Sequence, residues 1–445
     1  MRMGVLSCAA MRAGRWLLIV ILWVVGCGPE IRLPSHGGPA WVEVQSEHFT
    51  LWTDGSAQRG REIVGEMERR RQVILTALSP ASRTRVFVIA LRDRLEVGDY
   101  RPVNVEASAW DADNPTGHPG ILMAADDVDH KHVANHEMAH VFSFEVVAHQ
   151  PAWLAEGIAQ YFDTFDVSSG RADVTIGIPR GDHLRFLASR YPLPAADLFS
   201  CKVGCGDDQF YATSWAVFSL LVDHHHAQLT RFLQRLDELW DSSDDAPWYR
   251  PMAALPKAER ERKIEQRRER RRSWAARAWR EAFPDLPPDK LDRELLDWLV
   301  AGKLRLPHIP VTVGDVRVTE RKLDEADVLA ARSWLGFMFT DDMAAARRDA
   351  SEALALDRTH VLARLIMTAL VHTITPDDAR ATAAAHPDDW RALRLVVLAL
   401  SGTREGDEAL GRLCAMSTNA VPECAHADGH RDASAIGTGS TILPK

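Results

Sequence analysis

The segment His136-Glu137-Met138-Ala139-His140 places two histidines four residues apart, with a glutamate directly after the first. On an α-helix, residues four apart differ by about 40° around the axis, so both imidazoles project from one face. Two such nitrogens can reach one zinc ion at about 2 Å. Glu137 is rotated by about 100° from His136, which puts its carboxylate beside the metal with room for a water between them. The motif therefore encodes two metal ligands and a base.

A catalytic zinc site also needs a third protein ligand and one open position. The short pattern recurs by chance, and a chain with 18 histidines can place a solvated pair on a helix face. Glu156 follows in "PAWLAEGIAQYF" (151–162), after an interval that allows one helix to end and a second to return. We therefore expect Glu156 to be the third ligand, the alternative being a surface carboxylate.

The combination "HEMAH…WLAEGIAQYF" resembles the glutamate-zincin (gluzincin) superfamily of metallopeptidases. It is most similar to bacterial peptidase-MA-like proteins, which pair W-L-x-E-G-x-A with HExxH and often carry tetratricopeptide repeats. The resemblance covers roughly residues 41–245. It implies that His136, His140 and Glu156 bind Zn²⁺, that Glu137 activates the attacking water, and that the substrate is a peptide or protein.

The oxyanion formed during amide hydrolysis usually has a second donor opposite the metal, and in related enzymes a tyrosine or histidine provides it. Tyr211, in "QFYATSW" (209–215), is our candidate. A tyrosine of the core or of the cleft wall is the alternative, and Tyr161 is a second possibility among only five tyrosines. The run 224–226, three histidines after a long apolar stretch, indicates the charged end of a helix.

Zinc-bound imidazoles usually donate their other N–H to a carboxylate or carbonyl. Gln160 stands one turn after Glu156, where many relatives carry an acid, and Asp163 two turns along is a substitute. "GILMAA" (120–125) resembles the edge strand with which such proteases pair extended substrates. A buried core strand explains this segment equally well.

The N-terminus carries Arg2, Arg12 and Arg15 before the apolar run "WLLIVILWVV". That run is too short to span a bilayer but has the length of a signal-peptide core. "VVGC" resembles a bacterial lipobox, which implies cleavage before Cys27 and lipidation of its thiol; an ordinary signal sequence is the alternative. We expect an exported lipoprotein of the cell envelope, held at the membrane through Cys27. The net charge of −9 does not suggest a nucleic-acid partner.

Without Cys8 and Cys27, two cysteine pairs remain, each close in sequence: 201 with 205, and 414 with 424. In an oxidising compartment, two local disulfides are the simplest prediction. Metal binding by "CKVGC" (201–205) is the alternative, although no second ligand pair lies nearby.

The pattern of strands and helices predicts an α+β fold. A zincin-like catalytic domain, with a small mixed sheet, the HExxH helix and a helical subdomain, would precede an all-α, tetratricopeptide-like region. The residues 98–119 indicate a loop and 303–323 a connector. The predicted division is 1–26 signal peptide, 27–40 tether, 41–245 peptidase domain, 246–305 helical extension, 324–400 helical repeats, and 401–445 a partly disordered tail.

The C-terminal region carries weak signals for tetratricopeptide repeats. Phe337, Ala346 and Ala353 fit small and apolar positions of that pattern, whereas Arg358 stands where it prefers proline. Two degenerate units fall short of the roughly three that a stable array needs, so plain helical hairpins are nearly as well supported. Either way, we expect an appendage that binds a protein partner. The arginine-rich helix over 256–283 indicates a solvated face, or else a site for an acidic partner.

These observations favour a membrane-anchored, exported zinc metallopeptidase with Glu137 as the general base. The alternative is a catalytically weak or inactive zincin-fold lipoprotein that acts as a scaffold through its C-terminal helices. Hydrolysis of a non-peptide amide by the same residues is a third hypothesis. The sequence does not specify the substrate.

Overall fold

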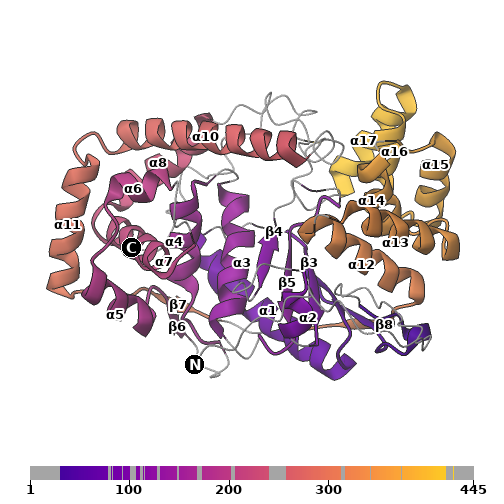
Figure 1. Cartoon of the computed structure of the whole chain (residues 1–445), viewed down its shortest axis with the longest axis horizontal. Helices are drawn as coiled ribbons and strands as arrows, with labels where there is room; N and C mark the ends of the chain where they lie inside the picture. The colour runs from indigo at the N-terminus through magenta and orange to yellow at the C-terminus, as the bar shows by residue number, and fades with distance from the viewer. Residues whose placement is uncertain are drawn as a thin grey trace, which may run out of the picture.

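The computed structural model contains a helical half, a central sheet and a C-terminal set of helices, which Figure 1 shows from left to right. It describes residues 31–78, 82, 84–92, 94–100, 107–110, 114, 116–127, 131–147, 150–167, 173–201, 206–239, 257–311, 316–340, 342–371, 373–416 and 424. The predicted signal peptide, Cys27 and the segment from 425 lie outside these residues. Within them, no helix is long and apolar enough to cross a bilayer.

The sheet has six strands in the order β4-β5-β3-β2-β1-β8. Parallel pairing joins β2 to β3 and β3 to β5, and the other neighbours are antiparallel. Every residue of β3 and β5 is buried, which matches their continuous apolar sequences. The strands are β1 (Val42–Gln45), β2 (Phe49–Thr53), β3 (Val86–Leu91), β4 (Ser108–Trp110), β5 (Gly120–Ala124) and β8 (Thr319–Lys322).

The segment "GILMAA" forms β5, which lies between β3 and β4, so of the two alternatives the buried core strand is confirmed and the edge strand is wrong. Two other expectations about this sheet were wrong. The edge strand beside β5 is the short β4, in the segment predicted as a loop. At the other edge, β8 arises from the predicted connector and pairs with β1, so the sheet extends beyond residue 245. Its sequence "TERK" is exposed throughout and has no apolar alternation to reveal a strand.

One face of the sheet carries α1 (Ala57–Leu78) and α3 (Lys131–Val146). Met67 of α1 and Met138 and Phe142 of α3 are fully buried in one apolar cluster with Val88 and Ile121 of the sheet. The short α2 (Arg94–Gly98) lies beside β5. This packing fixes the axis of α3, the helix that contains the HExxH motif.

The helical half follows α3, as predicted. Trp153 of α4 packs in its core against Phe199, Phe232 and Trp279, with ring centroids 5.1–6.1 Å from its own. A small two-stranded sheet joins β6 (Asp173–Thr175) to β7 (His308–Pro310). The helices are α4 (Ala152–Phe162), α5 (Gly181–Arg190), α6 (Ala195–Ser200), α7 (Asp208–His224), α8 (His226–Leu239), α10 (Lys257–Ala282) and α11 (Pro288–Ala301).

Gly157, the glycine of "WLAEG", lies where α4 crosses α7. A Cβ atom at this position would lie 2.7 Å from the Ser214 carbonyl oxygen and 2.9 Å from Phe218 Cβ. Only glycine therefore allows α4 to approach α7 this closely. The motif residue sets the position of the helix that carries Glu156.

The C-terminal helices are not an appendage, contrary to our expectation. Residues of α12, α13 and α14 share one buried cluster with Trp52, Ile89 and Leu122 of the sheet, and so cover its second face. The helices of this region in the described residues are α12 (Glu325–Phe339), α13 (Met343–Leu356), α14 (Val361–Val371), α15 (Pro376–Ala385), α16 (Trp390–Ala399) and α17 (Arg404–Met416). Helices α12, α13 and α14 pack on one another, and α16 packs on both α15 and α17.

The helix α17 lies in the segment 401–445 that we predicted as a partly disordered tail. The predicted disulfide between Cys414 and Cys424 is present and ties the end of α17 to the chain beyond it. Cys201 is also disulfide-bonded, and its predicted partner Cys205 lies outside the described residues. The helical C-terminal region is therefore one helix longer than the sequence suggested.

Candidate metal centre

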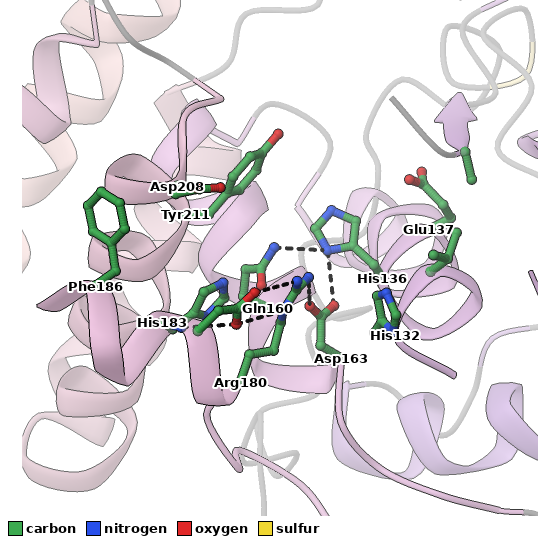
Figure 2. A pocket seen from close by; sticks show the side chains of 13 residues that line it. His132, His136, Glu137, Gln160, Asp163, Arg180, His183, Phe186, Asp208 and Tyr211 are labelled. Atoms are coloured by element: carbon green, nitrogen blue, oxygen red, sulfur yellow. Dashed lines mark hydrogen bonds and ion pairs between the residues drawn. The ribbon is translucent and has the colours of Figure 1, made fainter. Parts of the chain in front are cut away.

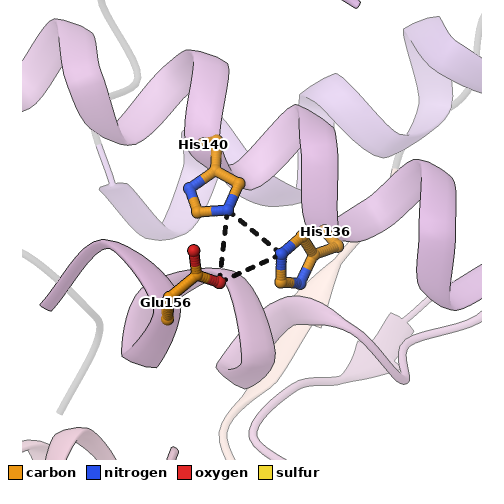
Figure 3. Close-up of side chains that lie close together, drawn as sticks. All are labelled: His136, His140 and Glu156. Atoms are coloured by element: carbon orange, nitrogen blue, oxygen red, sulfur yellow. Dashed lines mark hydrogen bonds and ion pairs between the residues drawn. The ribbon is translucent and has the colours of Figure 1, made fainter. Parts of the chain in front are cut away.

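Three side chains from two helices converge at one point (Figure 3). His136 and His140 lie one turn apart on α3, and their Nε2 atoms are 3.0 Å apart. Glu156 of α4 places its Oε2 atom 3.3 Å from His136 Nε2 and 3.5 Å from His140 Nε2. The structure thus brings together the three residues that the sequence predicted as ligands.

The triangle formed by these three atoms has the dimensions of a zinc site. Ligand atoms at about 2.0–2.1 Å from a tetrahedral ion lie about 3.3 Å from one another, close to the three observed separations. Glu156 Oε2 is buried and has no hydrogen-bond partner among the described residues. An unsatisfied buried carboxylate oxygen facing two imidazole nitrogens fits a shared cation better than it fits a hydrogen-bonded cluster. Two nitrogens and one oxygen also form a donor set that zinc accepts.

The electrostatics of the cluster point the same way. Burial alone would raise the pKa of Glu156, but His140 and His136 lower it well below its ordinary value. Burial alone would lower the pKa of His136, but Asp163 and Glu156 raise it well above its ordinary value. The cluster therefore favours a positive charge at its centre, and a divalent ion can take the place of the proton.

Asp163 is the hydrogen-bond partner behind His136. Its Oδ1 atom lies 3.0 Å from His136 Nδ1, and its side chain is only 1% exposed. Gln160 also approaches this nitrogen, with Nε2 at 3.3 Å. Because a carboxylate only accepts, Asp163 fixes the proton on Nδ1 and leaves the Nε2 lone pair free for a metal. Of the two candidates from the sequence, the aspartate has the geometry of this role.

A buried polar network holds α4 against α3 beside the cluster. Asn135, directly before His136, donates from Nδ2 to the carbonyl oxygens of Asp163 at 3.0 Å and Phe165 at 2.9 Å. Arg70 of α1 donates to Asn135 Oδ1 at 2.9 Å. Sequence reasoning missed both residues, although a polar residue on the buried side of the HExxH helix is a usable signal. This network fixes the distance between the two ligand-bearing helices.

Glu137 points away from the three ligands toward the sheet. The amide of Ala109 in the edge strand β4 donates a hydrogen bond of 2.5 Å to Glu137 Oε2. The predicted base is therefore attached to the strand that borders the site. Figure 2 shows its carboxylate on the opposite side of His136 from Asp163.

Residues 128–239 match the model of a family described as a protein of unknown function, DUF1570. The chain carries a DUF1570 domain. This domain extends from the start of α3 to the end of α8, so it contains all three converging side chains and Glu137. No curated protein and no solved structure matches the chain.

A cavity of about 500 Å³, lined mostly by residues of the DUF1570 domain and also by Ala107, opens beside His136 and Glu137 (Figure 2). Tyr211, near the start of α7, lines this cavity, and its ring centroid lies 6.4 Å from that of His136. Burial, with the negative charges of Glu156 and Glu137, raises the pKa of Tyr211 to about 12. Its hydroxyl is therefore a neutral donor near neutral pH, on the cleft wall.

Tyr161 and the histidine run at 224–226, which the sequence analysis also considered, lie away from the cavity. Tyr161 faces the core, where its ring packs against Phe218 and lies directly against Gly177. His225 pairs with Glu294 at 2.7 Å, at the end of α7. Neither residue lines the cavity beside the converging ligands.

The cavity also contains charged residues that the sequence analysis did not identify. Arg180, directly before α5, lies 3.7 Å from Asp163 Oδ2 and pairs with Asp182 at 2.7 Å. His183 is buried beside them, and its Nδ1 has no partner in the described part of the chain. These residues belong to no short motif, so only the fold reveals that they share the cavity.

Proposed function

We propose that this protein is a zinc metallopeptidase of the gluzincin type. The observation that carries the proposal is the triangle of His136, His140 and Glu156, with Asp163 behind His136 and Glu137 in the lining of the adjoining cavity. The DUF1570 family is known in gluzincin-like proteins, which adds support. Zinc bound by these three residues would polarise the scissile carbonyl and make water a usable nucleophile at neutral pH.

The chain's own groups supply the remaining chemistry. Glu137 takes a proton from the attacking water and delivers it to the leaving amine. The neutral hydroxyl of Tyr211 donates a hydrogen bond to the developing oxyanion. The strand β4 ends the sheet, and no strand of the described residues pairs with its outer side. An extended peptide can therefore bind there by backbone hydrogen bonds.

Replacing the base while keeping the ligands tests this proposal. We expect Glu137→Gln to retain about one zinc per chain and to lose cleavage of an unstructured protein substrate by about 10²–10⁴-fold. Glu145→Gln is the matched control, because this glutamate lies two turns further along α3 and, in the part of the chain that the structure describes, accepts a hydrogen bond from Ser82. Unchanged cleavage in Glu137→Gln would exclude a peptidase that uses this site.

The alternative, a scaffold that works through its C-terminal helices, has weaker structural support. The helices α12 and α14 bury apolar side chains against the sheet, so these faces are not available to a partner. The scaffold hypothesis, in which the protein keeps the zinc or merely the fold, predicts no effect of Glu137→Gln.

We further propose that the enzyme is an exported lipoprotein anchored through Cys27. The support is the lipobox-like "VVGC" after the basic and apolar segments. Radiolabelled fatty acid should enter the wild-type protein but not Cys27→Ser. Equal labelling of both proteins would refute the anchor and leave the peptidase proposal unaffected.

A further inference from the structure

Arg394, in the middle of α16, is completely buried. Its Nη1 atom donates a hydrogen bond of 3.1 Å to the carbonyl oxygen of Asn114, which lies 280 positions earlier in the chain. Arginine is rarely buried without such a contact, because removing the guanidinium from water is costly. The bond joins the C-terminal helices to the loop between β4 and β5.

The same loop contacts α16 along its backbone. Gly117 has a φ angle of +67°, and a Cβ atom there would lie 2.8 Å from Trp390 and 2.9 Å from the Arg394 guanidinium. The ring of His118 lies 4.8 Å from that of Trp390. The loop backbone is therefore seated directly on α16.

Hydrogen bonds continue from this loop into the edge strand. The Asn114 side chain donates to the His118 carbonyl oxygen at 2.7 Å. The indole of Trp110, the last residue of β4, donates to the same oxygen at 3.0 Å. Trp110 also packs against Trp334 of α12, with ring centroids 6.0 Å apart. One end of β4 is thus held by two helices of the C-terminal set.

The strand β4 needs such support. It has three residues and pairs only with β5 among the described strands, and short two-stranded pairings have little stability of their own. Its central residue, Ala109, donates to Glu137. A shift of β4 would therefore move the substrate-pairing edge.

We propose that α16 positions the edge strand for substrate, with Arg394 as the positioning residue. The C-terminal helices are then part of the catalytic unit. This inference rests on the proposed peptidase function, because β4 is assigned there as the strand that pairs with an extended substrate. Arg394 acts through the loop and touches neither the substrate nor the metal ligands.

Two variants perturb the contact from opposite sides. Arg394→Met removes the donor, and Gly117→Ala adds a methyl group that pushes the loop off α16. For each we expect KM for an extended peptide to rise by about tenfold, while kcat changes by less than about twofold. A blocked dipeptide reporter, which cannot reach along β4, should be cleaved at the wild-type rate. Arg394→Lys keeps a buried cationic donor and should recover part of the loss.

Arg380→Met is the matched control, because Arg380 belongs to the same helical set but pairs with Glu405 on its surface. It should leave KM unchanged. Equal losses with the extended peptide and the reporter, or no loss with either, would overturn the inference.

A second measurement does not depend on activity. The amides of residues 107–110 should exchange hydrogen for deuterium about tenfold faster in Arg394→Met and Gly117→Ala, with exchange in α3 unchanged. Unaltered exchange in β4 would refute the positioning role. If the wild-type protein cleaves no peptide but β4 exchanges faster in both variants, the proposed function fails and the structural coupling stands.

Discussion

The two faces of the central sheet differ in what they bury. Alternate residues of β3 point to opposite sides: Val86 and Val88 join the cluster under α1 and α3, whereas Phe87 and Ile89 join the cluster under α12–α14. On the α3 side, the apolar layer adjoins buried polar residues such as Asn135 and Asp163, which lie beside the proposed metal ligands. The opposite side is dominated by aromatic and aliphatic packing.

The two faces therefore contribute differently: the α12 face mainly stabilises the fold, and the α3 face carries the candidate site. Buried polar groups contribute little net stability unless every donor and acceptor is paired, so a face that carries a site is a weaker source of stability than an apolar face. The C-terminal helices compensate by covering the other side of the same strands. Changes on the α12 side should therefore affect the fold, and changes on the α3 side should affect metal binding.

Removing the cover of the apolar face should have the largest effect. A chain lacking residues 324–445 would expose one whole face of the sheet, including Phe87, Ile89 and Leu122. We expect no cooperative thermal transition and loss of near-ultraviolet circular dichroism, because exposing these apolar side chains to water is unfavourable. A chain that ends at residue 424, and so keeps the Cys414–Cys424 disulfide, is the control. A stable, zinc-binding truncation would show that the faces are independent.

A single substitution on the apolar face should lower stability without changing metal binding. Trp334 is fully buried and packs against Trp110. Trp334→Ala should lower the free energy of unfolding by about 3–5 kcal/mol, as measured by urea denaturation. Zinc content per folded molecule should stay as in the wild type. Loss of zinc from protein that remains folded would contradict the division between the faces.

Gly157→Ala tests the link between packing and the site. The added methyl group meets the Ser214 carbonyl oxygen, so α4 must move away from α7 and carry Glu156 with it. We expect about 1–3 kcal/mol of destabilisation, together with weaker zinc binding in a competition titration. Gly411→Ala is the matched control: it lies in α17 with nothing near the new Cβ, and should be neutral or slightly stabilising.

On the site face, Asp163→Asn should weaken the metal site with little effect on the fold. Without the carboxylate, His136 loses the acceptor that fixes its tautomer. Zinc affinity should fall by about 10–100-fold, measured against a chelator of known affinity. The thermal transition of the metal-free protein serves as the control. If the zinc affinity were unchanged, Gln160 and not Asp163 would be the residue that orients His136.

The smallest expected effect is a pH dependence of stability caused by Asp54, which directly follows β2 and belongs to neither face. Burial, and then the nearby Glu96 carboxylate, raises the pKa of Asp54 to about 7. Because the folded state holds this proton more tightly than the unfolded state, stability declines as pH rises from about 4 to about 7. Asp54→Asn should remove this decline and raise the free energy of unfolding above pH 7. If the free energy of unfolding changed with pH in the same way in both proteins, Asp54 would not be the source of the decline.

Local patterns predicted the parts of the site that lie close in sequence. The i, i+4 spacing placed His136 and His140 on one helix face, and "WLAEG" indicated the helix of Glu156. The substitute role of Asp163 was also visible, because it depends on helical spacing from Glu156. Arg70 and Asn135 were missed, since their importance comes from contacts between separate helices. Zinc itself remains a prediction.

The sheet was harder to predict because its edges depend on pairing between distant segments. β8 has four exposed polar residues and is a strand only because β1 lies beside it. β4 has three residues, too few to show an alternating pattern. The apolar positions of α12 and α14 predicted helices but could not show that a sheet would be their partner. Periodicity identifies a buried face but not what covers it.

The pairing of β8 with β1 also constrains the order in which the chain can fold. The sheet begins at Val42 and is completed only by residues 319–322, and its apolar face is covered only after that. Contacts so far apart in sequence slow folding, and open apolar strands favour aggregation in the interval. During synthesis, the N-terminal strands must remain incomplete until nearly three quarters of the chain has appeared. Refolding in vitro should accordingly be slow and sensitive to protein concentration.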